Sequence, residues 1–503
     1  MVMVSHALCG LSGSRFLTQQ LTSFNCRNLN RRCYLDRKLF DSRIRSHDFR
    51  MRRGVLRVYA MDDDSAGFSS FDDWGHSNEP VDYVFSSSDG DNSDGEAMLQ
   101  PITDVDLPST KEEWLAPEDS LRVTTHRLAM LGRTRSRRKT VYGILNNVGL
   151  VLFSTFLLLL VDQCAWRIVR LPLSPFHLMR PFLISVVLAA SFGYICVPLF
   201  HMLKLHSIVR KAVPRQHYNK KKILTLGGLY FVPIGLLVAE VVLKFSSIEV
   251  TGAAAATIAF AAVGLMDDFL NINNTDGLPG WMRLLLETAV GTWFSYWSYT
   301  TDISTPYSMK MVVPLPAPLG LVCLQKSYPA LTAFCFVSMA NGINLTDGLD
   351  GMAAGTAALA FIGMSIVVLP ICSDLSIFGA SMAGACIGFL FQNRYKASIF
   401  MGETGALALG GALAAMASCT GMFLPLLVSS GVFVLEALSV IMQILSFKAS
   451  KYLWRRGFRL FRMVPLHHHL QLCGMREPVI VASAYIVTCA LTLCAAYLGL
   501  TSA

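Results

Sequence analysis

The sequence predicts an all-α polytopic membrane protein with about ten transmembrane helices, or eleven if one further apolar segment also crosses. Hydrophobic residues make up 53% of the 503 residues, and charged residues make up only 15%. Apolar windows of membrane-spanning length recur from about residue 180 to the end of the chain, and polar residues gather between them. Such a chain is too apolar for a soluble protein of this size, so we expect a multi-pass membrane domain behind a polar leader.

The leader divides into two parts of different composition. Residues 1–60 are rich in Arg and Ser and lack the apolar core of a secretory signal, which is typical of an organelle transit peptide. We expect import into a plastid, and the alternative is a disordered basic tail. Residues 61–140 are first acidic (DDD, FDDW, SSSDGDNSDGE) and then basic (RTRSRRK), with too little apolar surface to form a core. This second part is expected to be a disordered linker.

Ten apolar windows account for the membrane domain, which we place at residues 176–503. They lie near residues 180–204, 226–245, 249–266, 281–300, 327–343, 351–371, 376–393, 404–420, 422–446 and 478–500. An eleventh stretch, residues 144–161 within the segment 141–175, either crosses the membrane or forms an interfacial helix. The basic run at residues 133–139 favours crossing, because positive charge beside a span belongs on the cytosolic or stromal face.

The composition of the loops predicts orientation and limits the partners. If the ten spans alternate, every second loop lies on one face, and those five loops hold nearly all the polar sequence and most of the basic charge. That face is therefore predicted to be cytosolic or stromal. The same loops and the leader explain the net charge of +9, so we expect contact with membrane lipid and no nucleic-acid partner. The 13 cysteines include no CxxC pair and are best explained as free thiols.

Carboxylate and amide side chains adjoin apolar runs in three motifs on this common face. They are Asn344, Asp347 and Asp350 in NGINLTDGLDG, Asp267 and Asp268 in GLMDDFLN, and Glu403 in FMGETG. Ionisable groups at a membrane edge are costly and therefore usually functional. A lone Asp pair after a span would usually be a solvated helix end, but several acidic clusters on one face predict a Mg²⁺-dependent site for phosphate chemistry.

Further polar residues have both a structural and a functional interpretation. The tract His467–His469 could be a spacer, a structural metal site or a contact for substrate phosphate, with Arg456 and Arg462 as neighbouring cations. Glu436 is a rare carboxylate within an apolar run, and Asn393 and Gln443 are weaker candidates of the same kind. The Gly-rich stretch GALALGGALAA is interpreted as helix packing. Lys220, Lys221 and Lys222 could be orientation signals or ligands.

These motifs together resemble those of a known family. GLMDDFLN, NGINLTDGLDG, FMGETGALALGG, VFVLEALSVIMQ, FRMVPLHHHLQLCG with REP following, and LGGL at residues 226–229 occur in unbroken order from about Arg180 onward. In this they resemble the phospho-N-acetylmuramoyl-pentapeptide-transferases, or MraY-type translocases, of the polyprenyl-phosphate sugar-1-phosphate transferase superfamily. The triple histidine is the mark of the muramoyl-pentapeptide branch.

The resemblance implies an activity, partners and a location. The reaction is the Mg²⁺-dependent transfer of phospho-MurNAc-pentapeptide from UDP-MurNAc-pentapeptide to a polyprenyl phosphate, which gives lipid I and UMP in peptidoglycan precursor synthesis. With the transit peptide, it implies a multi-pass protein of the plastid inner envelope whose active site faces the stroma. The sequence leaves open whether the protein forms a homodimer.

By the same resemblance, individual residues receive roles. Asp267 would activate the acceptor, with Asp268, Asp347 and His467 as further catalytic residues, and Glu403 and Asp347 would bind the metal. Substrate binding would involve Asn344, Asp350, Asn393, Arg283, His468, His469, Glu436 and Gln443.

Four positions depart from the family pattern and keep other functions open. Glu403 stands where the family has Asp, Asn271 and Arg283 stand where it has Lys, and Ala406 stands where it has Ser. A carboxylate one methylene longer can reach Mg²⁺ only if the octahedral geometry of the ion is kept. The alternatives are a transferase for another UDP-sugar such as GlcNAc, and a catalytically silent membrane scaffold or ion-coupled transporter.

Overall fold

The protein is described here by a computed structural model, which covers residues 139–164, 173–203, 224–272, 277–301, 312–316 and 320–502. The predicted transit peptide, the linker up to residue 138, and Lys220 to Lys222 lie outside the described residues. A first helix spans Lys139–Cys164. The elements after it are α2 (Met179–Met202), α3 (Gly228–Val242), α4 (Ile248–Ile272), α5 (Gly280–Thr300), β1 (Val312–Pro314), β2 (Leu321–Cys323), a 3₁₀ turn (Gln325–Ser327), α7 (Tyr328–Thr346), α8 (Met352–Val368), α9 (Ser373–Asn393), α10 (Gly402–Thr420), α11 (Phe423–Ser429), α12 (Gly431–Trp454), α13 (Leu466–Leu472) and α14 (Glu477–Ser502).

Each predicted apolar window coincides with one or two of these helices. Six helices within the described residues are long and apolar enough to cross a membrane: Lys139–Cys164, α2, α4, α9, α12 and α14. Two shorter apolar helices are α3 and α8. The chain is thus a nearly all-helical multi-pass membrane protein, and the count of ten spans stays a prediction.

Two local predictions were wrong. The window expected to end at residue 266 continues as α4 to Ile272, so that Asp267 and Asp268 lie within the last turns of a helix. The window 422–446 is broken after Ser429 into the short α11 and the long α12. The segment before α7 contains a short antiparallel pair in which Val313 faces Val322, which was not predicted from the sequence.

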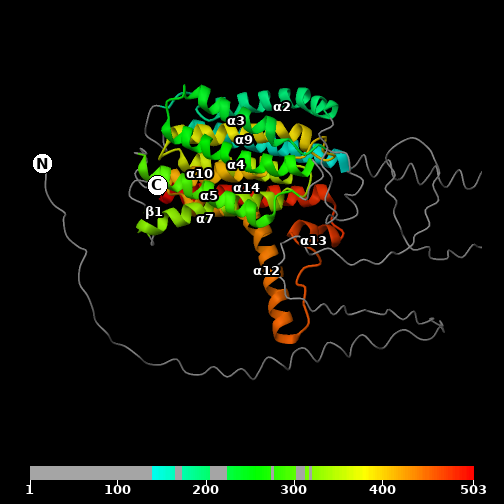
Figure 1. Ribbon diagram of the computed structural model, residues 1–503. Helices are drawn as coiled ribbons and strands as arrows, with labels where there is room; N and C mark the ends of the chain where they lie inside the picture. The colour runs from blue at the N-terminus through cyan, green and yellow to red at the C-terminus, as the bar shows by residue number, and fades with distance from the viewer. Residues whose placement is uncertain are drawn as a thin grey trace, which may run out of the picture. The chain divides into compact units, whose positions relative to one another are not determined.

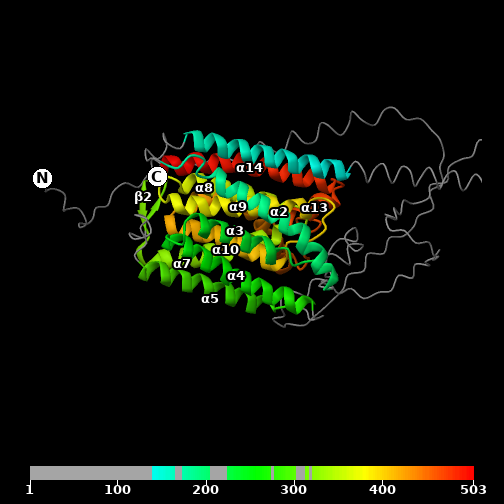
Figure 2. The same ribbon diagram turned by 90° about the horizontal axis from the view of Figure 1, so that it is seen from above.

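The buried centre of the bundle is formed by α8, α9 and α10. Every side chain of α8 is buried, whereas α2 leaves large apolar side chains such as Val187 and Ile195 exposed. The helix α9 lies between α2 and α8, α10 lies between α4 and α7, and α14 packs on α8 (Figures 1 and 2). An apolar outer face on a membrane helix suits contact with lipid chains. The orange helix α12 leaves the bundle steeply, and its far end, with Tyr452, is exposed (Figure 1).

Small residues set the closest helix contacts. A Cβ on Gly410 of α10 would lie 2.4 Å from the Cα of Ala340 in α7, and one on Gly411 would lie 2.8 Å from the ring of Phe260 in α4. Close backbone approach of this kind is how small residues join membrane helices. The interpretation of GALALGGALAA as packing is confirmed, and this packing fixes the start of α10 beside the ends of α4 and α7.

Candidate active site

The first contact that builds the site joins the end of α4 to the start of α10. One carboxylate oxygen of Asp268 accepts a hydrogen bond from the backbone N–H of Glu403 (3.1 Å). The other accepts hydrogen bonds from the N–H (2.9 Å) and the hydroxyl (2.6 Å) of Thr404. The first N–H groups of a helix have no partner within it, and they attract negative charge. Asp268 therefore caps α10 from a neighbouring helix.

The turn before α10 requires glycine. Gly402 has a φ of +77°, and a Cβ there would lie 1.9 Å from the carbonyl oxygen of Thr225 and 2.8 Å from a carboxylate oxygen of Asp268. No other residue fits a left-handed position so crowded by backbone. Gly402 therefore fixes the backbone just before Glu403, and with it the position from which the Glu403 side chain extends.

Asp347, at the end of α7, lies among other negative groups. Burial raises the pKa of its carboxyl well above the usual value. Neighbouring carboxylates raise the pKa further, namely those of Glu403, Asp268 and Asp350. The backbone N–H of Gly402 donates a hydrogen bond that acts in the opposite direction. Four carboxylates predicted from three separate motifs thus meet at one end of the bundle.

Glu403 also contacts cationic and amide groups. Its Oε2 accepts hydrogen bonds from Nη1 of Arg283 (3.0 Å) and from Nδ2 of Asn344 (2.6 Å). Nε of Arg283 lies 3.6 Å from a carboxylate oxygen of Glu287 one turn further along α5. The amide of Asn341 donates to Glu287 as well. Two of the departures from the family pattern, Glu403 and Arg283, are thereby direct partners.

Asp267 points away from its neighbour Asp268, because successive side chains on a helix diverge by about 100°. One of its oxygens accepts a hydrogen bond from the N–H of Leu278 (2.7 Å), and the other accepts one from the amide of Asn271 (3.1 Å). The side chain is fully buried. Asp267 lies on a helix because α4 extends to Ile272, beyond the predicted end of this apolar window at residue 266.

His467, the first of the three consecutive histidines, lies against the loop that follows α7 and contains Asp347. A Cβ on Gly348 would lie 2.1 Å from Nε2 of His467, so the ring rests against the backbone next to Asp347. On its other side, Nδ1 of His467 lies 3.2 Å from a carboxylate oxygen of Glu436, and both side chains are buried. Glu436, the rare carboxylate within an apolar run, therefore has His467 as a polar partner.

The other two histidines have hydrogen-bond partners within their own segment of the chain. Nδ1 of His468 lies 2.9 Å from the amide oxygen of Gln471. Burial, and secondarily the neighbouring His467, lower the pKa of His468 to about 4, so this ring is neutral near pH 7. His469 accepts a hydrogen bond from the backbone N–H of Arg462 at 3.3 Å.

The other residues predicted to bind substrate form hydrogen bonds to the backbone of neighbouring loops. Asn393 accepts a hydrogen bond from the N–H of Gly351 (3.0 Å) and donates one to the carbonyl of Ile399 (2.8 Å). Asp350 accepts one from the N–H of Ala397 (3.2 Å). Gln443 accepts one from the N–H of Phe461 (2.8 Å). Their direct contact with substrate stays a prediction.

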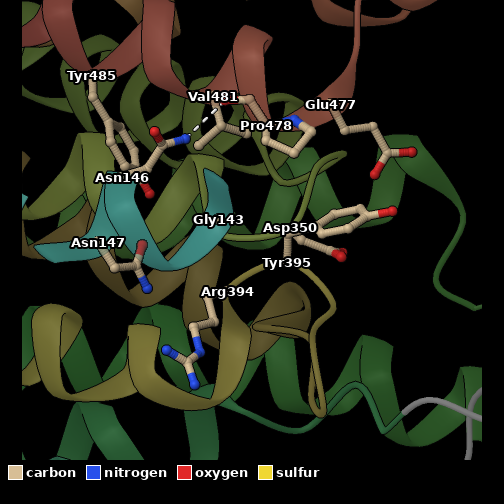
Figure 3. Close-up of a pocket in the computed structure, with 10 residues that line it drawn as sticks. All are labelled: Gly143, Asn146, Asn147, Asp350, Arg394, Tyr395, Glu477, Pro478, Val481 and Tyr485. Carbon is tan, nitrogen blue, oxygen red and sulfur yellow. Dashed lines mark hydrogen bonds between the residues drawn. The ribbon is translucent and has the colours of Figure 1, made fainter. Parts of the chain in front are cut away.

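A small pocket opens beside Asp350 (Figure 3). Its lining residues come from the first helix, from the loop between α7 and α8, from the loop after α9 and from the first turns of α14: Gly143, Asn146, Asn147, Asp350, Arg394, Tyr395, Glu477, Pro478, Val481 and Tyr485. The hydroxyl of Tyr485 donates to the carbonyl oxygen of Gly351 at 2.7 Å, which fixes the end of the NLTDGLDG segment.

Three residues of this network were missed by sequence reasoning. They are Thr404, Asn341 and Glu287. A Thr in the first turn of a predicted helix and an Arg–Glu pair four residues apart are recognisable signals. The partners of these side chains, however, come from other helices and are not visible in local sequence.

The fold is that of a multi-pass membrane protein with carboxylates gathered at one end of its helices, and comparison with known proteins identifies its class as a membrane transferase. Residues 250–421 match the family model described as Glycosyl transferase family 4. A phospho-N-acetylmuramoyl-pentapeptide-transferase from Microcystis aeruginosa is 38% identical over 345 residues, which cover 68% of this chain and 94% of the relative. Proteins of the same name from Picosynechococcus (39% over 317 residues, 62% and 84% covered) and Nostoc (37% over 330 residues, 64% and 86% covered) are also similar. The chain belongs to the phospho-N-acetylmuramoyl-pentapeptide-transferase family.

The cap formed by Asp268 leads to a prediction about stability. Asp268→Ala should lower the free energy of unfolding by about 1–2 kcal/mol, because two N–H groups of α10 lose their acceptor. Thr404→Val, which removes only the hydroxyl donor, should cost less. Thermal denaturation of the purified protein in detergent measures both. Asp374→Ala, in the first turn of α9, is the matched control, and a loss for Asp268→Ala no larger than for this control would contradict the assignment.

Proposed function

We propose that this chain transfers phospho-MurNAc-pentapeptide from UDP-MurNAc-pentapeptide to a polyprenyl phosphate, forming lipid I and UMP. The observation that carries the proposal is the meeting of Asp347, Glu403 and His467 at one end of the bundle in a member of this family. Breaking one pyrophosphate linkage while making another requires no ATP. The site needs only to bind two phosphate-bearing substrates, neutralise their charge and accept a proton.

The residues fit a magnesium ion by their chemistry. All the candidate ligands are oxygen donors, which Mg²⁺ prefers, and Asp347 lies among like charges that a dication would offset. Within the described residues no three His, Cys, Asp or Glu side chains are already grouped as metal ligands. We assign Asp347 and Glu403 as the residues that would hold the ion. When bound, it would neutralise charge on the phosphate oxygens.

The adjacent carboxylates of Asp267 and Asp268 on α4 have different roles. Asp268 is engaged by the first turn of α10 and acts by positioning Glu403. Asp267 is the group we assign to accept the proton of the acceptor phosphate. The hydrogen bonds that its two oxygens accept from Leu278 and Asn271 fix the orientation of this carboxylate.

His467 is assigned to the donor. Its ring is held between the backbone of Gly348 and the carboxylate of Glu436, a carboxylate–histidine pairing that orients an imidazole. Negative charge develops on the leaving UMP, and a cation or hydrogen-bond donor at this place would stabilise it. His468, neutral near pH 7, is better suited to hydrogen bonding than to charge pairing.

The first functional prediction concerns the carboxylates. Asp267→Asn and Asp347→Asn should each reduce turnover by at least about 10²-fold, because each keeps the shape of the side chain but removes its charge. UMP release from UDP-MurNAc-pentapeptide, with a polyprenyl phosphate in detergent, is the measurement. Asp374→Asn, at the opposite end of α9 from the site, is the control.

The same assay separates the candidate functions. Turnover of UDP-GlcNAc in place of UDP-MurNAc-pentapeptide would favour the alternative UDP-sugar transferase. Wild-type-like UMP release by Asp267→Asn or Asp347→Asn would refute the roles assigned here. A wild-type protein that turns over neither donor would favour a silent scaffold.

The second functional prediction concerns Glu403. We propose a single in-line displacement by the prenyl phosphate, since a nucleophile displaced by one methylene would lose about 10²-fold in rate, whereas a metal ligand tolerates the change better. Glu403→Gln should weaken apparent Mg²⁺ affinity and turnover strongly. Glu403→Asp, which keeps the charge, should remain active or bind Mg²⁺ more tightly. Titration of UMP release with Mg²⁺ compares the variants, and a trapped phospho-MurNAc adduct on Glu403 would overturn the mechanism.

We further propose that the protein resides in the plastid inner envelope with this site facing the stroma. The support is the composition of residues 1–60, the basic face of the loops and the cyanobacterial relatives, which fit a plastid origin. A fusion of residues 1–60 to a fluorescent protein should be imported into plastids. A fusion that stays in the cytosol would contradict this location.

A further inference from the structure

The first helix, Lys139–Cys164, contacts the rest of the protein through one face. Gly143, Asn146, Asn147 and Leu150 are buried or half-buried, and their spacing of three and four residues places them on one side of a helix. Apolar side chains such as Leu152 are exposed on the other side. The helix precedes the region in which the family motifs occur, so its contacts are a feature of this chain in addition to those motifs.

Two amides attach this helix to the bundle. Nδ2 of Asn146 donates to the carbonyl oxygen of Pro478 at the start of α14 (2.8 Å), as the dashed line in Figure 3 shows. Nδ2 of Asn147 donates to the carbonyl oxygen of Leu390 near the end of α9 (3.1 Å). Polar side chains within apolar helices are costly unless paired. These two bonds therefore fix both the rotation and the depth of the helix.

A glycine brings the helix against the loop that follows α9. A Cβ on Gly143 would lie 3.0 Å from both the Cβ and the carbonyl oxygen of Tyr395. Contacts this short leave no room for a larger side chain unless the loop moves. By contrast, nothing lies within 4 Å of the corresponding position on Gly149 of the same helix.

The loop that contains Tyr395 is bonded to the carboxylate motif. Two residues further on, the N–H of Ala397 donates to Asp350 (3.2 Å). Asn393, just before the loop, binds the N–H of Gly351, and the loop leads directly into Gly402 and Glu403. A displacement of Tyr395 would therefore be transmitted to Asp350 on one side and toward Glu403 on the other.

We propose that Gly143, Asn146 and Asn147 are positioning residues, through which the first helix holds the loop 394–401 against Asp350 and so sets the affinity for the donor substrate. This inference rests on the proposed function. The pocket of Figure 3 is the junction at which the helix, the loop and Asp350 meet. Asp350 and Asn393, which hold this loop, are among the residues assigned to substrate binding. Asp267, assigned to proton transfer, lies outside the junction, so the helix should affect binding of the donor more than the chemical step.

The test uses the full chain in detergent. Gly143→Leu should raise the KM for UDP-MurNAc-pentapeptide about tenfold, with kcat within about twofold and the KM for polyprenyl phosphate unchanged, since misplacement of a binding loop weakens one substrate. Gly143→Ala should have a smaller effect. Gly149→Leu is the matched control and should behave as the wild type.

A second variant removes contacts without adding bulk. The double change Asn146→Ala with Asn147→Ala should raise the donor KM in the same way, and calorimetric binding of the donor without acceptor should show the same loss of affinity. If Gly143→Leu does not fold, this double variant tests whether the first helix affects donor affinity. If neither variant folds, the helix is purely structural and the inference is overturned.

The outcomes distinguish this inference from the proposed function. A wild-type protein that binds no donor and releases no UMP refutes both. A wild-type protein that is active, with donor KM and donor affinity unchanged in both variants, overturns the inference alone. A fall in kcat with no change in donor KM would also overturn it.

Discussion

The bonds from the start of α10 to the Asp268 carboxylate are the contact on which the site depends. They satisfy N–H groups that would otherwise be unpaired in a region of low dielectric constant, where such groups are most costly. They also fix the sequence position at which α10 begins. Because Gly402 fits only one backbone conformation there, Glu403 is placed beside Asp347 instead of pointing into the bundle.

Gathering carboxylates in this way creates an electrostatic constraint that the neighbouring residues partly relieve. Arg283 lies between Glu287 and Glu403, and Asn344 donates a further hydrogen bond to Glu403. The longer carboxylate at position 403 and the planar, multiply donating guanidinium at position 283 are matched to each other, since Arg can bind several acceptors at once. Two departures from the family pattern that lie 120 residues apart in the sequence are therefore one coupled feature of the structure.

The sequence predicted well those features that depend on long apolar segments, because about twenty apolar residues have few alternatives to a helix. It placed α4 too short, since a carboxylate normally ends an apolar helix, and only the start of α10 makes Asp268 acceptable within one. The carboxylates and His467 were predicted from motifs. The contacts of Thr404, Glu287 and Asn146 were not predicted, because each depends on a partner from a helix distant in sequence.

The carboxylates and the histidine are positioned by different parts of the fold. The packing of α10 between α4 and α7 places Asp268, Asp347 and Glu403, and small residues hold this packing closely. His467 lies on the short α13, which reaches the site because α12 leaves the bundle and the chain returns, with Glu436 of α12 beside the imidazole ring. A change in the direction of α12 would move the histidine relative to the carboxylates without disturbing α4 or α10. The proposed donor contact of His467 thus depends on α12 and α13, whereas the carboxylates depend on the packing of α4, α7 and α10.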